Sequence, residues 1–197
     1  LLDAQVAALS HAAMGYLVSG DPVPRCGTQS PTAAPSQMYR CADGAVMLVV
    51  GNKAQWQKFC GVMGRPDLPA DPRFASNPDR VSHRAELNAI LAPVFAAQPR
   101  AHWIAALAAV GVPCGPVNEL HEVFADPQVC AREMLVHLPH PQRAAMPMLA
   151  NPIRLSETPV QYRHRPPALG EHTDEVLAEL PGYDAARRQA LRERGVT

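Results

Sequence analysis

Apolar residues near the start of the chain recur at helical spacing, at Leu2, Val6, Leu9, Ala13 and Leu17. This spacing predicts one amphipathic helix over residues 1–19, which Gly20-Asp21-Pro22 ends. The next stretch, residues 20–36, is rich in Pro, Gly, Ser and Thr and shows no periodicity. It is predicted to be a long irregular segment, and such segments are often functional in compact proteins.

Two short apolar runs, residues 37–41 and 45–50, follow the irregular segment and predict a β-hairpin. They flank Ala42-Asp43-Gly44, and an Asp-Gly step between apolar runs is a strong hairpin signal. The next apolar pattern, over residues 53–63, predicts a helix with Trp56, Phe59 and Cys60 on one face.

Two more helices are predicted before residue 111. Asn77-Pro78 resembles an N-cap followed by proline in the first turn, so a helix is expected from Asn77 to about Ala97, with a break near Pro93. Gln98-Pro99 opens the second helix, whose C-cap is predicted to be Gly111. Its apolar stripe consists of Trp103, Leu107 and Val110.

The remainder of the chain is predicted to contain short elements around a proline-rich connection. The expected elements are an extended piece at 112–117, a helix from an Asn118 cap to Ala125, a capped start at Asp126-Pro127, strands at 134–138 and 147–150, a connection at 151–172, a helix capped by Thr173 to about Leu180, and a last helix from Asp184 to about Arg194. This order predicts an α+β fold in which helices dominate.

Composition excludes some classes of partner. The 197 residues include 18 basic and 18 acidic side chains, so the formal net charge of zero does not favour nucleic acid or an anionic membrane. No apolar run approaches the roughly 20 residues that span a bilayer. The five cysteines form no CxxC pair, which favours reduced thiols and a cytoplasmic location.

The first residues, Leu1-Leu2-Asp3, include neither a methionine nor a basic segment, so no signal peptide is expected. Because the chain starts inside an amphipathic pattern, we expect it to be a fragment or a processed piece.

Three groups of residues are candidates for chemistry, and for each the residues favour a structural role. His137 and His140 lie in an extended stretch that would point their rings apart, which disfavours zinc. Cys114 has no base beside it in sequence that would make it a thiolate. Glu171-His172 could be an acid–base pair by residue type, although adjacent residues at a helix start usually serve as caps.

Short motifs along most of the chain resemble one family. They are Leu1 to Gln5 (LLDAQ), Pro35 to Tyr39 with Ala42-Asp43-Gly44, Val50-Gly51-Asn52, Asp71 to Phe74 (DPRF), Asn77 to Arg84, residues 111–117 (GVPCGPV), Asp126-Pro127-Gln128 and Pro166 to Thr173 (PPALGEHT). In this order they are similar to the C-terminal half of class III CoA-transferases, the formyl-CoA transferase or CaiB–BaiF type. The pattern is most similar to members that act on small dicarboxylates such as glutarate.

The resemblance implies a domain organisation. Residues 1–19 would be a helix of a Rossmann-like large domain that is otherwise missing, and 20–36 a linker with an active-site loop. Residues 37–140 would form a small α+β domain, and 141–197 a return linker and terminal helices that dock on the large domain. Two such subunits interlock in the family, which implies a homodimer.

The resemblance also implies a chemistry. An aspartate attacks an acyl-CoA thioester, and CoA then moves through an aspartyl-CoA thioester to a carboxylic acid. In this family the nucleophilic aspartate lies upstream of Leu1, so Asp3 is not expected to take its role. CoA and acyl-CoA would be substrates, with no covalently bound cofactor and no metal, and this chain alone would be inactive without the N-terminal half.

The irregular segment would then supply the acyl pocket. It matches a glycine-rich loop of formyl-CoA transferases, but residues 28–35 contain no glycine, which implies a stiffer wall than a swinging lid. The residues expected to line the pocket are Gln29, Ser30, Pro31, Thr32, Ala33 and Gln37. The alternative for this segment is an ordinary connection between domains.

Two alternative functions remain open from the sequence. An acyl-CoA racemase shares the family architecture but needs a His/Asp proton-transfer pair from the other half. A non-catalytic binding or assembly module would follow if the chain were complete as it stands.

Overall fold

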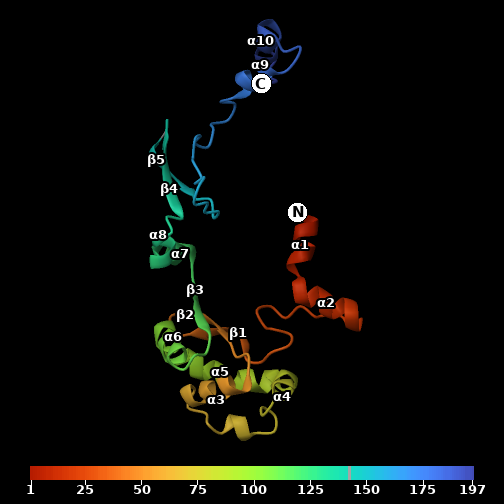
Figure 1. Cartoon of the computed structure of the whole chain (residues 1–197), viewed down its shortest axis with the longest axis vertical. Coiled ribbons are helices and arrows are strands. Elements are labelled where there is room, and N and C mark those ends of the chain that lie inside the picture. Colours follow the sequence, from red (N-terminus) through yellow and green to blue (C-terminus); the bar gives the residue numbers. More distant parts are fainter. Residues whose placement is uncertain (142) are drawn as a thin grey trace. The chain divides into compact units, whose positions relative to one another are not determined.

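The computed structural model describes residues 1–141 and 143–197, and its fold is helix-rich α+β as predicted (Figure 1). The chain divides into two compact units, Leu1–Glu119 and Leu120–Thr197. In the described part of the chain no helix is both long and apolar enough to cross a lipid bilayer.

The first unit begins with two helices where the sequence predicted one. α1 spans Leu2–Ala8 and α2 spans Ser10–Ser19. Ser10 has a φ of 46°, a left-handed conformation that interrupts the right-handed helical path. Gly20, with a φ of 76°, ends α2 where the sequence predicted a stop.

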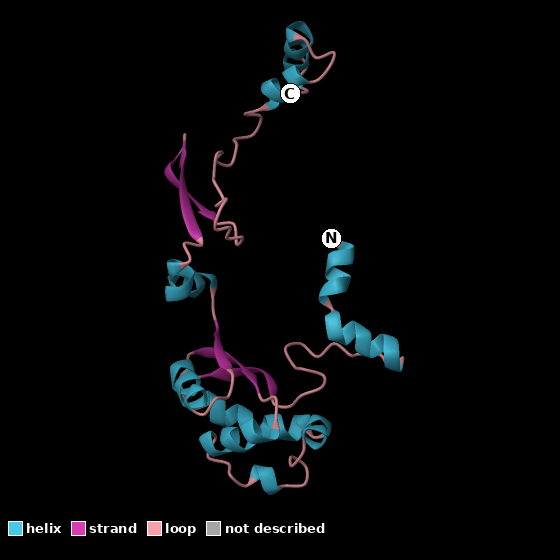
Figure 2. Ribbon diagram, in the orientation of Figure 1, coloured by secondary structure: helices cyan, strands magenta, loops and turns pink. Residues whose placement is uncertain are grey.

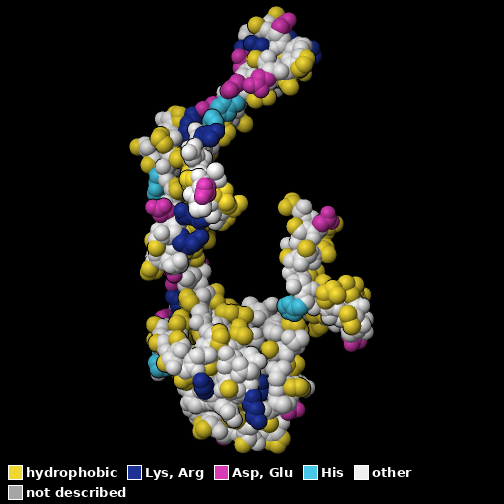
Figure 3. All heavy atoms as spheres, in the orientation of Figure 1, with side chains coloured by type: hydrophobic (Ala, Val, Ile, Leu, Met, Phe, Trp, Pro, Cys, Tyr) yellow, Lys and Arg dark blue, Asp and Glu magenta, His cyan; other side chains and the backbone are white. Residues whose placement is uncertain are grey.

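Neither α1 nor α2 contains a buried residue. Their apolar side chains are exposed, including Leu2 at 76% and Leu17 at 70%. Figure 3 shows apolar side chains gathered over α2. The apolar side chains of α1 and α2 are therefore not covered by another element in the described part of the chain.

A three-stranded antiparallel sheet forms the centre of the rest of the first unit. β1 (Ser36–Cys41) and β2 (Gly44–Val49) make the predicted hairpin around Ala42-Asp43, and β3 (Cys114–Val117) pairs with the other edge of β2. The predicted extended piece is therefore an edge strand of this sheet. The turn residue Asp43 accepts a 2.7 Å hydrogen bond from the backbone N–H of Arg100, one of the free amides at a helix start.

Helices cover one face of this sheet (Figure 2). The helices in contact with the strands are α5 (Arg84–Ala96) and α6 (Arg100–Ala109). Behind them, α3 (Lys53–Val62) packs against α6 and against the short 3₁₀ helix η1 (Leu68–Ala70), and α4 (Asn77–Ser82) packs against α5. The predicted apolar face of α3 is confirmed, because Trp56, Phe59 and Cys60 are all buried. Tyr39 of β1 stacks on Phe95 of α5 with ring centroids 4.5 Å apart, which joins sheet and helices.

Two predictions about the helices after residue 76 were wrong. The N-cap of α4 is Ser76, which forms a capping box with Asp79, and Asn77 is the first helical residue. The helical path breaks at His83 and continues through Pro93. Proline removes one hydrogen bond of α5, and the buried Leu91 and Phe95 on either side of it hold the helix against the core.

The second unit contains short elements and little buried surface. α7 (Leu120–Ala125) and α8 (Pro127–Ala131) precede the hairpin of β4 (Leu135–His140) and β5 (Arg143–Leu149), and α9 (Thr173–Glu179) and α10 (Ala185–Glu193) follow the connection. Among the side chains described in this unit, Ala150 alone is buried. A unit of this kind does not build a core of its own.

The caps of the second unit were predicted in part. Asp126 caps α8 by accepting from the backbone N–H groups of Gln128 and Val129, and Asp184 caps α10 by accepting from that of Arg187. The prediction for Thr173 was wrong, because His172 takes the N-cap position of α9 without a side-chain bond and Thr173 is the first helical residue.

Candidate functional site

The irregular segment expected to line a pocket lies at the entrance to β1, and we call residues 28–35 the strap. Gly27 has a φ of 59°, which allows the turn in which Gln29 N–H donates to the Cys26 carbonyl at 3.0 Å. The Ser30 N–H donates to the Ser36 carbonyl at 2.9 Å and closes the strap onto β1. The strap is thus a defined loop with its own backbone hydrogen bonds.

Asn77 of α4 holds two residues of the strap with one side-chain amide. Its Oδ1 accepts from the Ala34 N–H at 3.2 Å, and its Nδ2 donates to the Thr32 carbonyl at 2.8 Å. The amide therefore substitutes for the backbone partner that a strand would offer at this point.

Arg80, one turn further along α4, holds the end of the strap from inside the core. It is 2% exposed, and its Nε donates to the Ala34 carbonyl at 2.6 Å. Another nitrogen of the same guanidinium donates to the Phe74 carbonyl at 3.2 Å, and the group lies over the Trp56 ring. Burial lowers the pKa of Arg80 from its usual value.

Arg84 at the start of α5 holds the beginning of the strap. Its Nη2 donates to the Ser30 carbonyl at 2.6 Å. Its Nη1 is buried and has no hydrogen-bond partner in the described part of the chain. Buried polar atoms without a partner are uncommon in native proteins.

A small polar network continues from the strap along β1 and α5. Asn88 donates through Nδ2 to the Gln37 Oε1 at 3.2 Å and accepts from the Tyr39 hydroxyl at 2.8 Å. Burial raises the pKa of Tyr39, and the nearby Arg84 only partly opposes this effect. Tyr39 therefore keeps its proton at neutral pH, donates to Asn88, and fixes the orientation of the Gln37 side chain.

Five of the six residues expected to line a pocket lie in the strap, and the sixth, Gln37, lies in β1. Gln37 is 8% exposed. Of the others, Gln29, Ser30 and Ala33 are half-buried, and Pro31 and Thr32 are exposed. The Ser30 Oγ accepts from the Thr32 N–H at 3.3 Å and lies 3.5 Å from the Thr32 Oγ1, so the strap carries two neighbouring hydroxyl groups.

The contacts that hold the strap and the neighbouring Gln37 were not predicted from the sequence, where Asn77 was interpreted as a helix cap and Asn77 to Arg84 as part of the family resemblance. Asn77, Arg80, Arg84 and Asn88 follow one another at intervals of three and four, the spacing that places residues on one helix face. This periodicity of polar residues was the available signal, because a buried helix face rarely carries arginine without a specific partner.

The other candidates have structural roles. The Glu171 carboxylate accepts from Arg165 through two guanidinium nitrogens and from the Ala168 N–H at 2.7 Å. These bonds, the arginine first, lower the pKa of Glu171 to about 2, so it holds no proton to donate at neutral pH. His172 contacts Glu175 at 3.2 Å instead of forming a pair with its neighbour.

Cys114 in β3 is a poor nucleophile. Burial, with a smaller effect of Cys41, raises the pKa of its thiol to about 11. The thiol is therefore protonated at neutral pH, and the thiolate is the nucleophilic form.

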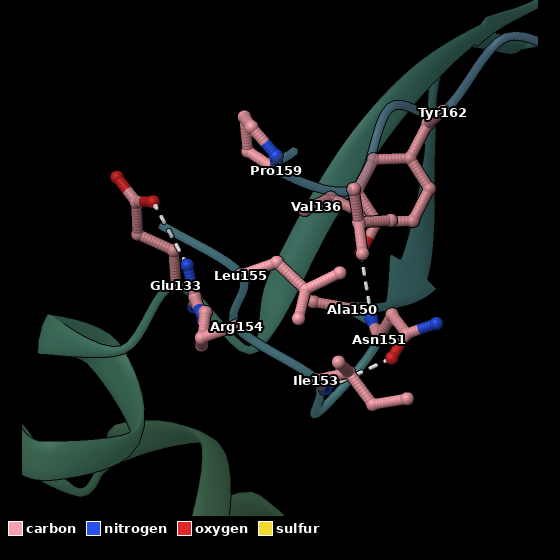
Figure 4. A pocket seen from close by; sticks show the side chains of 10 residues that line it. Glu133, Val136, Ala150, Asn151, Ile153, Arg154, Leu155, Pro159 and Tyr162 are labelled. Atoms are coloured by element: carbon pink, nitrogen blue, oxygen red, sulfur yellow. Dashed lines mark hydrogen bonds and ion pairs between the residues drawn. The ribbon is translucent and has the colours of Figure 1, made fainter. Parts of the chain in front are cut away.

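A hollow of about 290 Å³ lies beside the β4–β5 hairpin, where the connection from residue 151 turns back on it (Figure 4). Its polar groups contact one another: the Tyr162 hydroxyl accepts from the Asn151 N–H at 2.6 Å, and Arg154 lies 4.0 Å from Glu133. This pairing stabilises the connection and leaves no convergent acid and base, so the hollow is a weaker candidate site than the strap.

The fold is similar to part of a longer protein of known structure. The chain is similar to a crystal structure of a CaiB/BaiF family protein from Brucella suis, with a TM-score of 0.72 and 38% identity over 90% of this chain and 45% of that one. Residues 1–173 match the family model described as CoA-transferase family III. The chain belongs to CoA-transferase family III.

Several relatives of known activity are similar to the chain. It is 38% identical to the succinate–glutarate CoA-transferase of Agrobacterium fabrum over 91% of its length, and 33% identical to the human succinyl-CoA:glutarate CoA-transferase over 93%. A formyl-CoA:oxalate CoA-transferase of Rhodopseudomonas palustris is 31% identical over 90%. The chain spans only 45%, 42% and 43% of these three relatives.

Proposed function

We propose that this chain is the C-terminal half of a CoA-transferase that moves CoA between an acyl-CoA and a small dicarboxylic acid. The observation that carries the proposal is that the strap is a defined loop. Side chains of α4 and α5 hold it in place, and the chain that contains it belongs to CoA-transferase family III. The two relatives named as glutarate CoA-transferases favour a dicarboxylate as the acid.

The reaction uses an aspartate supplied by the half that precedes Leu1. Its carboxylate attacks the thioester carbonyl, CoA thiolate leaves, and a mixed anhydride forms. The thiolate then attacks the aspartyl carbonyl and releases the first acid. The acceptor carboxylate displaces the thiolate to form a second anhydride, and the thiolate attacks the acceptor's carbonyl to release the new acyl-CoA and the aspartate.

The strap and the adjoining start of β1 form a wall of the acyl pocket, lined by Gln29, Ser30, Pro31, Thr32, Ala33 and Gln37. The two anhydrides and the aspartyl-CoA thioester are activated acyl groups that water would hydrolyse, so the pocket has to exclude solvent during the reaction. The hydroxyl groups of Ser30 and Thr32 are neutral donors that can bind a carboxylate of the acid substrate. A firmly held wall can both exclude water and present these hydroxyl groups to the acid.

The preceding half also provides the surfaces that this chain lacks. α1 and α2 bury no residue, and their exposed apolar side chains suit docking on a large domain. We assign residues 37–140 to the small domain and residues 141–197 to a return linker and helices that dock on the large domain. A homodimer of the two-domain subunit completes the assembly.

The proposal is tested by producing the chain together with the coding sequence that precedes Leu1 in its gene. Purified protein is incubated with succinyl-CoA and glutarate, and glutaryl-CoA is measured by mass spectrometry. We expect transfer that depends on both halves. Absence of transfer with a panel of acyl-CoAs and mono- and dicarboxylic acids would contradict the proposal, and deuterium exchange at the α-carbon without transfer would favour a racemase.

A further inference from the structure

We propose that Asn77 and Arg84 are positioning residues for the acyl pocket, acting through the backbone of the strap. This inference rests on the proposed function and adds a specific role for two side chains that do not line the pocket. It predicts that they set how far the site favours CoA transfer to an acid over hydrolysis of the acyl-CoA.

Three alternate carbonyls of the strap are bound by side chains of α4 and α5. Arg84 binds the Ser30 carbonyl, Asn77 the Thr32 carbonyl, and Arg80 the Ala34 carbonyl, at 2.6, 2.8 and 2.6 Å. These bonds fix the backbone at three successive points. The Ser30 and Thr32 hydroxyl groups, 3.5 Å apart, keep their spacing because the backbone beneath them is held.

Both positioning residues use their polar groups on the strap alone. Asn77 sits in the first turn of α4, but Ser76 provides the cap, and both ends of the Asn77 amide bind the strap. Within residues 1–141 and 143–197, the Ser30 carbonyl is the one hydrogen-bond acceptor of Arg84. Neither α4 nor α5 needs these side chains for its own stability, so we assign them the function of holding the strap.

Arg80 is unsuitable as a test residue, since it also binds Phe74 and lies over Trp56 in the core. Asn77→Ala and Arg84→Met remove the bonds to the strap with less effect on the core. Asn77→Asp keeps the acceptor for the Ala34 N–H and loses the donor to Thr32. Arg84→Lys keeps the charge and one donor.

The first measurement is hydrogen exchange of this chain alone, which requires no activity. In Asn77→Ala, we expect the Ala34 amide to exchange at least about tenfold faster, because its acceptor is removed. Amides of β2 should be unchanged. An unaltered Ala34 exchange rate would overturn the proposal whatever the activity of the protein.

The second measurement compares CoA transfer with acyl-CoA hydrolysis in the protein that includes the preceding half. For Asn77→Ala and Arg84→Met, we expect kcat/KM for the acid to fall roughly tenfold to a hundredfold, as misplacement of a substrate-positioning group does. The ratio of hydrolysis to transfer should rise. Asn77→Asp and Arg84→Lys should lie between these variants and the wild type.

Leu107→Val is the matched control, because Leu107 is a buried residue of α6 whose truncation reduces stability without touching the strap. It should leave the ratio of hydrolysis to transfer unchanged. Folded Asn77→Ala and Arg84→Met proteins with the wild-type ratio would refute the positioning role. A wild type without any transfer would refute the proposed function, and the exchange measurement would still decide whether Asn77 holds the strap.

Discussion

Arg80 lies over the indole ring of Trp56, with its guanidinium carbon 4.7 Å from the ring centroid. The indole N–H of Trp56 is buried without a hydrogen-bond partner in the described part of the chain. A buried cation is thus stabilised by an aromatic face and by the carbonyls of Ala34 and Phe74. The strap is in this way connected to the centre of the hydrophobic core.

Arg80→Met should reduce the free energy of unfolding by about 2–4 kcal/mol, because two buried carbonyls lose charge-assisted hydrogen bonds. Urea unfolding followed by tryptophan fluorescence measures the change. Arg65→Met is the control, since Arg65 forms an exposed ion pair with Asp67 and should have little effect. Equal stabilities of the two variants would contradict the assigned role of Arg80.

Ser76→Ala should reduce the free energy of unfolding by about 1 kcal/mol, as expected for loss of an N-cap. Ser76 accepts from the Asp79 N–H, and the Asp79 carboxylate accepts from the Ser76 N–H in return. Thermal unfolding of the chain measures the loss. Ser82→Ala, at the other end of the same helix, is the matched control, and a loss there as large as at Ser76 would argue against the capping box.

Glu171 should titrate near pH 2 in an NMR experiment, well below the usual value of about 4.3 for glutamate. Because the folded pKa is lowered, the Arg165–Glu171 interaction stabilises the turn above the unfolded pKa. This stabilisation is lost as the pH falls from about 4.3 through about 2. Arg165→Ala should return the pKa toward its usual value, and an unchanged pKa in that variant would show that another group lowers it.

Alkylation should distinguish the cysteines by environment. Burial raises the pKa of Cys60 to about 12 and that of Cys114 to about 11, so both should react slowly with iodoacetamide at pH 8. Cys130 is exposed and should be labelled first. Mass spectrometry of peptides after a time course provides the measurement, and rapid labelling of Cys60 in folded protein would contradict its burial.

Local patterns predicted much of the fold. The Asp-Gly turn gave the hairpin of β1 and β2, since a turn of this kind depends on adjacent residues. Asp126 and Asp184 cap their helices because no nearer competitor is present. Asn77 was predicted to cap by the same reasoning, but Ser76 takes that role.

For the candidate site, sequence reasoning reached only the features that are local in sequence. The strap was recognised from its lack of periodicity and from the resemblance of its surroundings to the CoA-transferase family. The side chains that hold it were missed, because Asn77 and Arg84 bind residues 43 to 54 positions earlier in the chain. No pattern within one helix specifies such a partner.

The sequence by itself determined the family, the helix-rich α+β class, the hairpin and the buried face of α3, all of which depend on residue order over short distances. Only the tertiary structure decided that α4 and α5 direct Asn77, Arg80 and Arg84 at the backbone of the strap. The physical reason is that a buried amide or guanidinium needs an acceptor, and which acceptor lies within reach is set by how distant segments pack.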